Sequence, residues 1–426
     1  MNAIAEKSKD AARVLAGLDT TSKNRALEAV AEAIEQQSVA ILTANRADVE
    51  QAKTDGVSKP LVDRLAIDEK KLAKIVAGVR AVAALADPAG HVVRRRRLDE
   101  GLILEQVTVP IGVLGIVFES RPDALVQIAS LALKSGNAVV LKGGREADRT
   151  NTALAAAIDQ ATGHNGVPAG WLELLHSREE VGRLLSMNDK IDLIIPRGSK
   201  EFVASIMEQS SIPVLGHADG VCHVYLHEAA DAELARRITV DAKTQYPAVC
   251  NAAETLLVDA AVAKSLLPAV ARDLEAAGVE LRGCPRTREI IDCAEATEAD
   301  WSAEYLDLVL AVKVVDGFDA AVAHIHQYGS SHTEAIVTAD EAVGRRFQAV
   351  VDASSVMWNC STRFADGFRY GLGAEVGIAT GKIHARGPVG LEGLCTTKWL
   401  LSGHGETVTE YENGGRSFSH QDLPLL

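Results

Sequence analysis

Short apolar runs that alternate with amphipathic segments constrain this chain most, and the alternation begins near residue 110. The runs at 137–142 (NAVVLK), 192–196 (DLIIP) and 254–258 (ETLLV) each precede a segment with apolar residues at helical spacing. Strands and helices that alternate with short connections predict parallel sheets covered by helices on both faces. A second alternation begins near Asp231. The sequence therefore predicts an α/β fold with two doubly wound parallel-sheet domains.

The remaining segments predict N-terminal helices and a small β element. Residues 92–109 read as a hairpin with a turn at 99–101, and 396–401 (TTKWLL) and 406–411 (ETVTEY) are two further strand candidates. An exposed β ribbon usually pairs with a partner subunit, so we expect a homo-oligomer. The expected cofactor-binding domain comprises 1–91 and 110–230, with a return segment near 370–394. The expected catalytic domain is 231–369, and the expected β-hairpin oligomerisation element comprises 92–109 and 395–426.

The charge balance argues against nucleic acid and anionic membranes as partners. The 426 residues carry a net charge of −14, from 44 Lys+Arg against 58 Asp+Glu. One basic run, Arg94–Arg97, fits the edge of a strand or hairpin better than a nucleic-acid patch. The N-terminus has no apolar core typical of a secretory signal, and no stretch is long and apolar enough to span a membrane.

The six cysteines are scattered and include no C-x-x-C pair. We therefore expect neither a metal site nor disulfides, and a reducing cytoplasm fits best. Cys250 differs from the others because it lies between a predicted helix and a predicted strand. A thiol at such a junction is accessible to substrate, whereas the other five read as small apolar core residues, the commoner use of free cysteine.

Two positions could hold a nucleotide, although no G-x-G-x-x-G follows any predicted strand. Lys142 ends an apolar strand, where nucleotide phosphates or ribose lie in such sheets, unless it simply reaches solvent. The turn Arg197-Gly198-Ser199 joins a strand to a helix, whose N–H groups could hold a phosphate. The alternative for Ser199 is an ordinary helix N-cap.

Three longer segments resemble a known family. They are 245–258 (QYPAVCNAAETLLV), 322–338 (VAHIHQYGSSHTEAIVT) and 354–380 (SSVMWNCSTRFADGFRYGLGAEVGIAT), and the likeness continues through 387–399 (GPVGLEGLCTTKW). They resemble the gamma-glutamyl phosphate reductases of the aldehyde dehydrogenase superfamily. The resemblance implies an aldehyde dehydrogenase-like fold and reduction of L-glutamyl 5-phosphate to L-glutamate 5-semialdehyde with NADPH, the second step of proline synthesis.

The resemblance also implies roles for individual residues. Cys250 takes the place of the catalytic thiolate, whose pKa we expect the site to lower, and Ser120 is a candidate for the oxyanion hole. The implied cofactor-binding residues are Lys142, Arg197, Gly198, Ser199, Leu215, Gly216 and Glu304. The implied substrate-binding residues are Arg121, Asn359, Ser361, Thr362 and Arg363; for each arginine, an ordinary ion pair is the alternative.

One departure from hydrolytic aldehyde dehydrogenases bears on the reaction. Those enzymes carry a glutamate where Val214 precedes Leu215-Gly216 here. The carboxylate that would activate water is therefore missing, which suits a thioester that exchanges with phosphate. The rival interpretation is an acylating dehydrogenase that uses coenzyme A. The acyl phosphate is expected from a separate protein, so a transient contact with glutamate 5-kinase is a further expectation.

Overall fold

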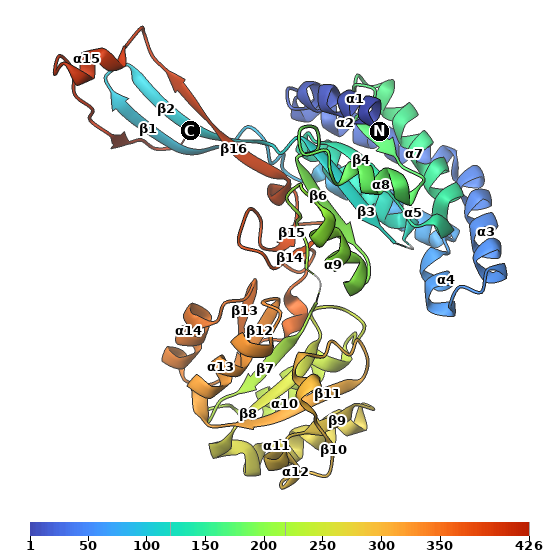
Figure 1. Ribbon diagram of the computed structural model, residues 1–426, viewed down its shortest axis with the longest axis vertical. Helices are drawn as coiled ribbons and strands as arrows, with labels where there is room; N and C mark the ends of the chain where they lie inside the picture. The colour runs from blue at the N-terminus through green and yellow to red at the C-terminus, as the bar shows by residue number, and fades with distance from the viewer. Residues whose placement is uncertain (120, 218, 426) are drawn as a thin grey trace.

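The computed structural model describes residues 1–119, 121–217 and 219–425, and its fold confirms the expected α/β architecture. Five helices precede the first strand and lie beside a four-stranded sheet (Figure 1). Asp19 and Asp68 cap two of these helices through their side chains, accepting hydrogen bonds from the N–H groups of Ser22 and Lys71. The five helices are α1 (Asn2–Leu15), α2 (Thr20–Gln36), α3 (Ser38–Thr54), α4 (Lys59–Leu65) and α5 (Glu69–Ala84).

The four-stranded sheet is parallel and has the order β5-β4-β3-β6. Its strands are β3 (Val113–Phe118), β4 (Ala138–Lys142), β5 (Leu172–Leu174) and β6 (Leu193–Arg197), and its helices are α6 (Pro122–Ser135), α7 (Asp148–Gly163), α8 (Arg178–Leu184) and α9 (Lys200–Gln209). Strands β3 and β4 are buried along their whole length, which explains their nearly continuous apolar sequence. The carboxyl ends of β3, β4 and β6 lie at one edge, where ligands bind in such sheets.

The second sheet is also parallel, with the order β10-β9-β11-β8-β7-β12-β13. Its strands are β7 (Cys222–Leu226), β8 (Ala253–Asp259), β9 (Glu280–Gly283), β10 (Ala294–Glu295), β11 (Val309–Val315), β12 (Thr333–Val337) and β13 (Ser355–Trp358). Its helices are α10 (Ala232–Thr244), α11 (Ala260–Ala276), α12 (Pro285–Arg288), α13 (Gly317–Tyr328) and α14 (Glu341–Val350). Because β7 pairs with β8 and β12, the expectation that residues up to 230 belong to the first domain is wrong at this strand.

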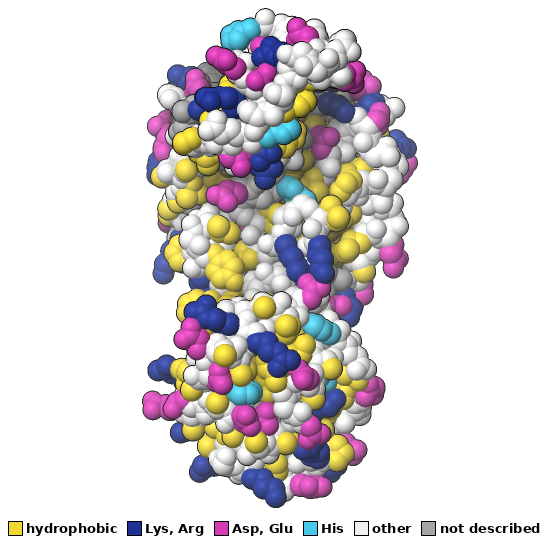
Figure 2. Space-filling model, turned by 90° about the vertical axis from the view of Figure 1, so that its left-hand side faces the viewer, with side chains coloured by type: hydrophobic (Ala, Val, Ile, Leu, Met, Phe, Trp, Pro, Cys, Tyr) yellow, Lys and Arg dark blue, Asp and Glu magenta, His cyan; other side chains and the backbone are white. Residues whose placement is uncertain are grey.

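A four-stranded antiparallel ribbon extends away from both sheets (Figure 1). It consists of β1 (Val92–Asp99), β2 (Leu102–Pro110), β16 (Cys395–Ser402) and β17 (Gln421–Asp422). The arginine run lies on β1, where Arg95 pairs with Glu105 at 3.0 Å and Arg96 with Asp422 at 2.7 Å. On the face shown in Figure 2, basic and acidic side chains are interspersed.

The predicted strand at 406–411 is wrong, because these residues begin α15 (Val408–Glu412). Thr407 and Glu410 form a capping box at its start, and this local bonding favours a helix over an extended chain. Between the ribbon and the second sheet, β14 (Gly377–Ala379) and β15 (Gly387–Val389) form a two-stranded sheet. Val376, Ala379 and Val389 pack into the hydrophobic core of the first sheet.

Candidate active site

Cys250 lies in the turn between α10 and β8, and its backbone is fixed by the first residue of β7 and by a glycine just before that strand. The Cys222 thiol donates a hydrogen bond to the Cys250 carbonyl at 3.2 Å. Gly220 packs so closely that a Cβ there would lie 2.1 Å from the Cys250 oxygen and 2.5 Å from its Cα. Since real Cβ atoms do not approach that closely, only glycine fits at position 220. The turn that carries the thiol is therefore set by the neighbouring strand.

Glu304 joins this arrangement through Gly220. Its Oε1 accepts a hydrogen bond from the Gly220 N–H at 3.0 Å. Burial raises the pKa of the Glu304 carboxyl, and the Gly220 hydrogen bond opposes that shift. The implied cofactor residue Glu304 thus lies beside the candidate nucleophile.

The electrostatics around Cys250 differ from our expectation. Burial, followed by the negative charges of Glu304 and Glu375, raises the pKa of Cys250 to about 12, while Arg363 opposes the shift. The expected lowering is therefore wrong for the thiol in this environment. The Cys250 thiol is neutral at pH 7, and its proton must be removed as it reacts.

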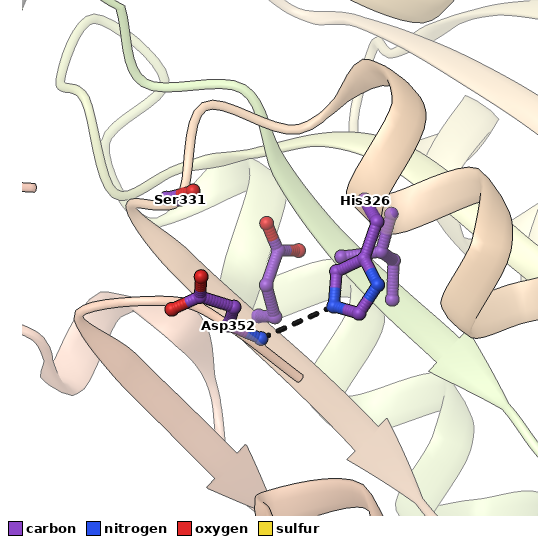
Figure 3. Close-up of a pocket in the computed structure, with 5 residues that line it drawn as sticks. His326, Ser331 and Asp352 are labelled. Atoms are coloured by element: carbon purple, nitrogen blue, oxygen red, sulfur yellow. Dashed lines mark hydrogen bonds between the residues drawn. The ribbon is translucent and has the colours of Figure 1, made fainter. Parts of the chain in front are cut away.

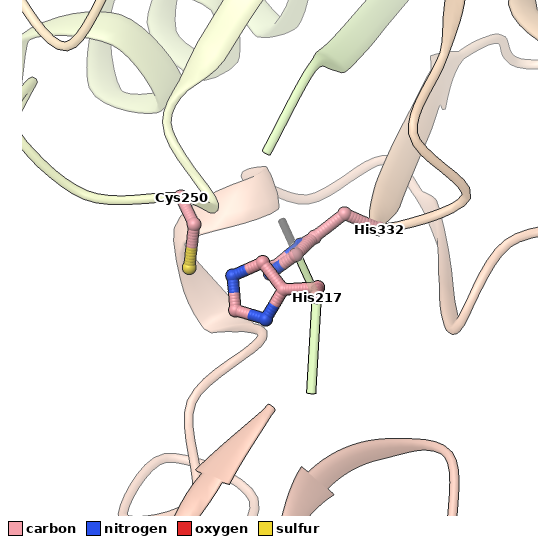
Figure 4. Close-up of side chains that lie close together, drawn as sticks. All are labelled: His217, Cys250 and His332. Carbon is pink, nitrogen blue, oxygen red and sulfur yellow. The ribbon is translucent and has the colours of Figure 1, made fainter. Parts of the chain in front are cut away.

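Two histidines stand next to this thiol. Figure 4 shows the His217 ring facing the Cys250 sulfur. The ligating atoms of His217, Cys250 and His332 all lie within 4.8 Å of one another. The two imidazole rings are edge to face, with centroids 4.8 Å apart. Burial lowers the pKa of both histidines, so both are neutral at pH 7.

The hydrogen bonds of the histidines determine which nitrogen faces the site. His217 Nδ1 lies 2.8 Å from the Ile378 carbonyl, which can only accept, so Nδ1 carries the proton and Nε2 is an acceptor. His332 Nδ1 lies 2.9 Å from the Thr333 hydroxyl. The His332 Nε2 atom is buried and has no hydrogen-bond partner among the described residues.

Neither His217 nor His332 was predicted from the sequence as a site residue. His217 directly follows the implied cofactor-binding pair Leu215-Gly216, and His332 lies inside the segment 322–338 that carries the resemblance. Both histidines therefore lie in or beside segments that the sequence already marked as functional. No spacing along the sequence, however, shows that they contact Cys250.

At the edge of the four-stranded sheet, Lys142 is buried rather than solvated. Its side chain ends β4, the residue is only 9% exposed, and its ammonium donates a hydrogen bond to the Gly143 carbonyl. Burial lowers the pKa of Lys142, while the nearby carboxylates Glu146 and Asp148 oppose that shift. The alternative of a lysine that reaches solvent is wrong, and a buried cation stands where such sheets bind nucleotides.

Ser199 is the N-cap of α9, so the alternative that this serine is an ordinary helix N-cap is confirmed. Its hydroxyl accepts a hydrogen bond from the Phe202 N–H at 3.4 Å. The Ser199 N–H donates to Glu119 Oε2 at 3.0 Å, and a Cβ at Gly198 would lie 2.4 Å from the same oxygen. The turn therefore holds a carboxylate at a helix N-terminus, an arrangement that also suits phosphate.

Arg197 links the edge of this sheet with the thiol. It is the last residue of β6 and interacts electrostatically with Cys250 and Glu375. Burial, followed by repulsion from Arg121, lowers the pKa of Arg197. A cleft of about 390 Å³ lies beside this region. It is lined by Val214, Leu215, Gly216, His217, Asp219, Ser330, Ser331, Thr380 and neighbouring residues.

The implied substrate loop is largely engaged with the protein itself. The Asn359 amide donates to the Thr338 carbonyl at 2.8 Å and accepts from the Thr338 N–H at 2.9 Å. Ser361 accepts from the Arg363 N–H at 3.3 Å. The hydroxyl of Thr362 is buried and has no hydrogen-bond partner among the described residues. Asn359 therefore shapes the loop, and the end near Arg363 approaches the thiol.

The two candidate arginines have different surroundings. Arg363 is buried and donates from Nε to Gln245 at 3.0 Å. Arg121 is exposed and lies 3.7 Å from Asp123, a loose ion pair. The oxyanion candidate Ser120 lies outside the described residues.

A smaller cavity of about 230 Å³ lies behind the segment that carries His332 (Figure 3). His326 accepts a hydrogen bond there from the Asp352 N–H at 3.2 Å, and Ser331 lines both this cavity and the larger cleft. Glu334, also on its wall, is fully buried and accepts from His223 Nδ1 at 2.9 Å. The hydrogen bond of this buried pair links the start of β12, just after Ser331, to β7.

Comparisons with known proteins agree with this arrangement. Residues 1–287 match the model of the aldehyde dehydrogenase family, so the chain belongs to that family. This membership supports a nicotinamide cofactor. Within the described part of the chain, no helix has both the length and the apolar character needed to cross a membrane.

Relatives that match nearly the whole chain at about 50% identity include gamma-glutamyl phosphate reductases, which confirms the resemblance. The chain is 52% identical to the enzyme of Pelotomaculum thermopropionicum over 99% of this chain and 98% of the relative. It is 54% identical to that of a Cyanothece species, over 99% and 97%. The crystal structure of the Thermotoga maritima gamma-glutamyl phosphate reductase superposes with a TM-score of 0.93 at 41% identity, over 95% and 98%.

Proposed function

We propose that this chain reduces L-glutamyl 5-phosphate to L-glutamate 5-semialdehyde and phosphate with NADPH, the second step of L-proline biosynthesis. The observation that carries the proposal is identity above 50%, over nearly the whole chain, to gamma-glutamyl phosphate reductases. The placement of Cys250 beside Glu304, His217 and Arg363 supports a reaction through a covalent thioester.

The residues at the sheet edge fit a dinucleotide. When bound, NADPH supplies the hydride. Lys142 offers a buried ammonium, and the turn at Gly198-Ser199 offers the N–H groups of a helix N-terminus. Leu215 and Gly216 line the cleft together with His217, and Glu304 accepts a hydrogen bond from Gly220 beside Cys250. Arg197, at the end of β6 and within electrostatic range of Cys250, places a second cation at the thiol end of the site.

Cys250 acts as the nucleophile, and His217 accepts its proton. Since the pKa of the thiol is about 12, a free thiolate is scarce, so the proton leaves as sulfur bonds to the acyl carbon. The lone pair of His217 Nε2 faces this thiol. Phosphate departs with the electrons of the broken carbon–oxygen bond. After reduction, the protonated His217 returns the proton to sulfur as the aldehyde is released.

Two further features orient the substrate and exclude water. Arg363 approaches Cys250 and is the better placed guanidinium for an anionic group of the substrate, while the side chain of Arg121 is exposed. Val214, on the wall of the cleft, has no carboxylate to activate water. The thioester therefore persists until it is reduced or meets phosphate.

The ribbon supports assembly. On β16, the side chains of Trp399, Leu400 and Leu401 are exposed apolar groups on a strand with one free edge. Covering such a row favours a homo-oligomer, and we propose that the subunits meet there. We further propose that the enzyme works in the cytoplasm and receives its unstable substrate through transient contact with glutamate 5-kinase.

The proposal is tested by running the reaction in reverse. NADP reduction is followed with glutamate 5-semialdehyde in buffers with phosphate, with coenzyme A, and with neither. We expect turnover only with phosphate. Dependence on coenzyme A would assign the chain to the acylating dehydrogenases instead. Turnover without either acceptor would mean that water deacylates the thioester, against the role given to Val214.

A further inference from the structure

The three side chains around the nucleophile form a set of metal ligands. Cys250 comes from the turn before β8, His217 from the segment after α9, and His332 from the start of β12. Their ligating atoms lie within 4.8 Å of one another. We propose that His217, Cys250 and His332 bind a soft divalent cation, with Zn²⁺ the best match, and that this binding reversibly blocks the thiol. The inference concerns inhibition and does not depend on the substrate proposed above.

The donor atoms match the chemistry of zinc. Zn²⁺ binds thiolate sulfur and neutral imidazole nitrogen, and sites with three protein ligands keep a fourth position for water. A ligating imidazole usually donates its other N–H to a carbonyl, which fixes the ring. His217 already has this arrangement, because its Nδ1–H donates to the Ile378 carbonyl.

His332 provides an independent indication of a ligand. Its Nε2 is buried and lacks a hydrogen-bond partner among the described residues, although buried polar atoms are normally paired. The residue is 0% exposed, and its Nδ1 lies next to the Thr333 hydroxyl. When Nδ1 carries the ring proton and donates to the Thr333 hydroxyl, Nε2 has an unused lone pair that a metal ion would satisfy.

The three ligand atoms would need to move only a short distance to coordinate one metal ion. Tetrahedral coordination with Zn–N of about 2.0 Å and Zn–S of about 2.3 Å places ligand atoms roughly 3.3–3.6 Å apart. The three atoms here are within 4.8 Å, so a shift of about 1 Å or a rotation of the Cys250 side chain would complete the site. His217 and His332 are held by their own hydrogen bonds, and the thiol moves toward them.

The surrounding charges do not oppose a cation. Glu304 and Glu375 disfavour the bare thiolate, and they would stabilise a dication bound to it. Arg363 and Arg197 contribute the opposite sign, so charges of both signs surround the three ligands. On binding, a sulfur–metal bond replaces the S–H bond and one proton is released to solvent.

The test uses the full chain and the metal alone. Co²⁺ is titrated into the reduced protein, and the thiolate-to-cobalt charge-transfer band is followed by absorbance. Zn²⁺ is then added to displace the cobalt, and inhibition of turnover with its reversal by a chelator is measured in parallel. We expect one equivalent to bind, with the band absent in Cys250→Ser.

Substitution of the histidines separates this site from simple thiol binding. His217→Asn and His332→Asn should each weaken Co²⁺ and Zn²⁺ binding about 10-fold or more. Cys293→Ser and His164→Gln, in other parts of the fold, are matched controls that should bind like the wild type. Binding that is unchanged in both histidine variants, or lost in Cys293→Ser, would overturn the inference.

The readouts also keep this inference distinct from the proposed function. The absorbance band reports metal binding without turnover, so it appears even if the substrate assignment fails. Conversely, phosphate-dependent turnover together with no Co²⁺ band would remove the metal site and leave the proposed reaction intact.

Discussion

The edges of the two parallel sheets hold their polar residues in different ways. At the four-stranded sheet, Lys142 occupies a strand end and Ser199 a helix N-cap, so each position follows from its own element. At the seven-stranded sheet, Cys250 is held by Cys222 and Gly220 and is surrounded by side chains from distant segments. The first arrangement is local and the second is long-range.

This difference predicts how the two regions respond to change. Helix caps and strand ends tolerate small backbone shifts, because their hydrogen bonds can re-form within a single helix or strand. At the other edge, the Cys250 backbone packs against Gly220. Any shift of Gly220 therefore moves Cys250 and its reacting sulfur. Four measurements on substituted or alkylated protein distinguish the two regions.

Cys250→Ser should remove the chemistry and leave the cofactor edge intact. We expect turnover to fall more than about 10³-fold, because a serine hydroxyl is a far weaker nucleophile at this position. NADP binding, measured by fluorescence titration, should stay within about twofold, since Lys142 and Ser199 belong to the other sheet. Cys293→Ser is the control, and substantial residual turnover would disprove the assignment of the nucleophile.

The alkylation of Cys250 should depend steeply on pH. Its pKa is raised to about 12, so the thiol is protonated throughout the assay range and the thiolate fraction grows as pH rises. The rate with iodoacetamide should increase about 100-fold from about pH 7 to about pH 9, since the thiolate is the nucleophile. A plateau near pH 8.5 would show that the environment does not raise this pKa.

Gly220→Ala and Gly198→Ala compare the two edges directly. A Cβ at 220 would meet the Cys250 backbone, whereas a Cβ at 198 would meet the ends of the Glu119 and Phe202 side chains. We expect kcat/KM to fall about 10–100-fold in Gly220→Ala, because misplacement of about 1 Å has that effect.

Gly198→Ala should mainly raise the cofactor KM, because side-chain ends can move aside. Gly182→Ala, an exposed helical position with open space around it, is the control for both substitutions. Equal losses of kcat in Gly220→Ala and Gly198→Ala would refute the distinction between the two edges.

Lys142→Met should have the smallest effect of the four. It removes a buried ammonium and keeps most of the side-chain volume, so the sheet should remain folded. The cofactor KM should rise about tenfold, the contribution of one charge-assisted hydrogen bond. Alkylation of Cys250 should be unchanged. A lower alkylation rate would mean that the two edges are coupled more tightly than their hydrogen bonds indicate.

The same contrast decides how much of the structure the sequence could predict. The expected 92–109 hairpin is β1 and β2, because the residues that determine a hairpin and its turn are local. At 406–411 the alternating pattern misled, although Thr407 and Glu410 form a capping box that the sequence also contains. The expected domain boundary at residue 230 placed the residues of β7 in the first domain, because strand pairing is not encoded locally.

The site shows the same limit. Lys142 and Ser199 lie at the strand end and helix start that the sequence predicted. The meeting of His217, His332 and Cys250 depends on how three segments pack, and the raised pKa of Cys250 depends on the burial that this packing creates. Neither can be deduced from spacing along one chain.

The pairing of β2 with β16 has a consequence for synthesis of the chain. Residues 102–110 are made early, yet their partner strand 395–402 follows roughly 290 residues later. At about 5–20 residues per second, the edge of β2 waits on the order of 15–60 s for its neighbour. A waiting edge invites aggregation, and charged residues such as Arg94–Arg97 on the adjoining β1 oppose it. In the folded ribbon, Arg96 of this run pairs with Asp422 on β17, a strand that is made later still.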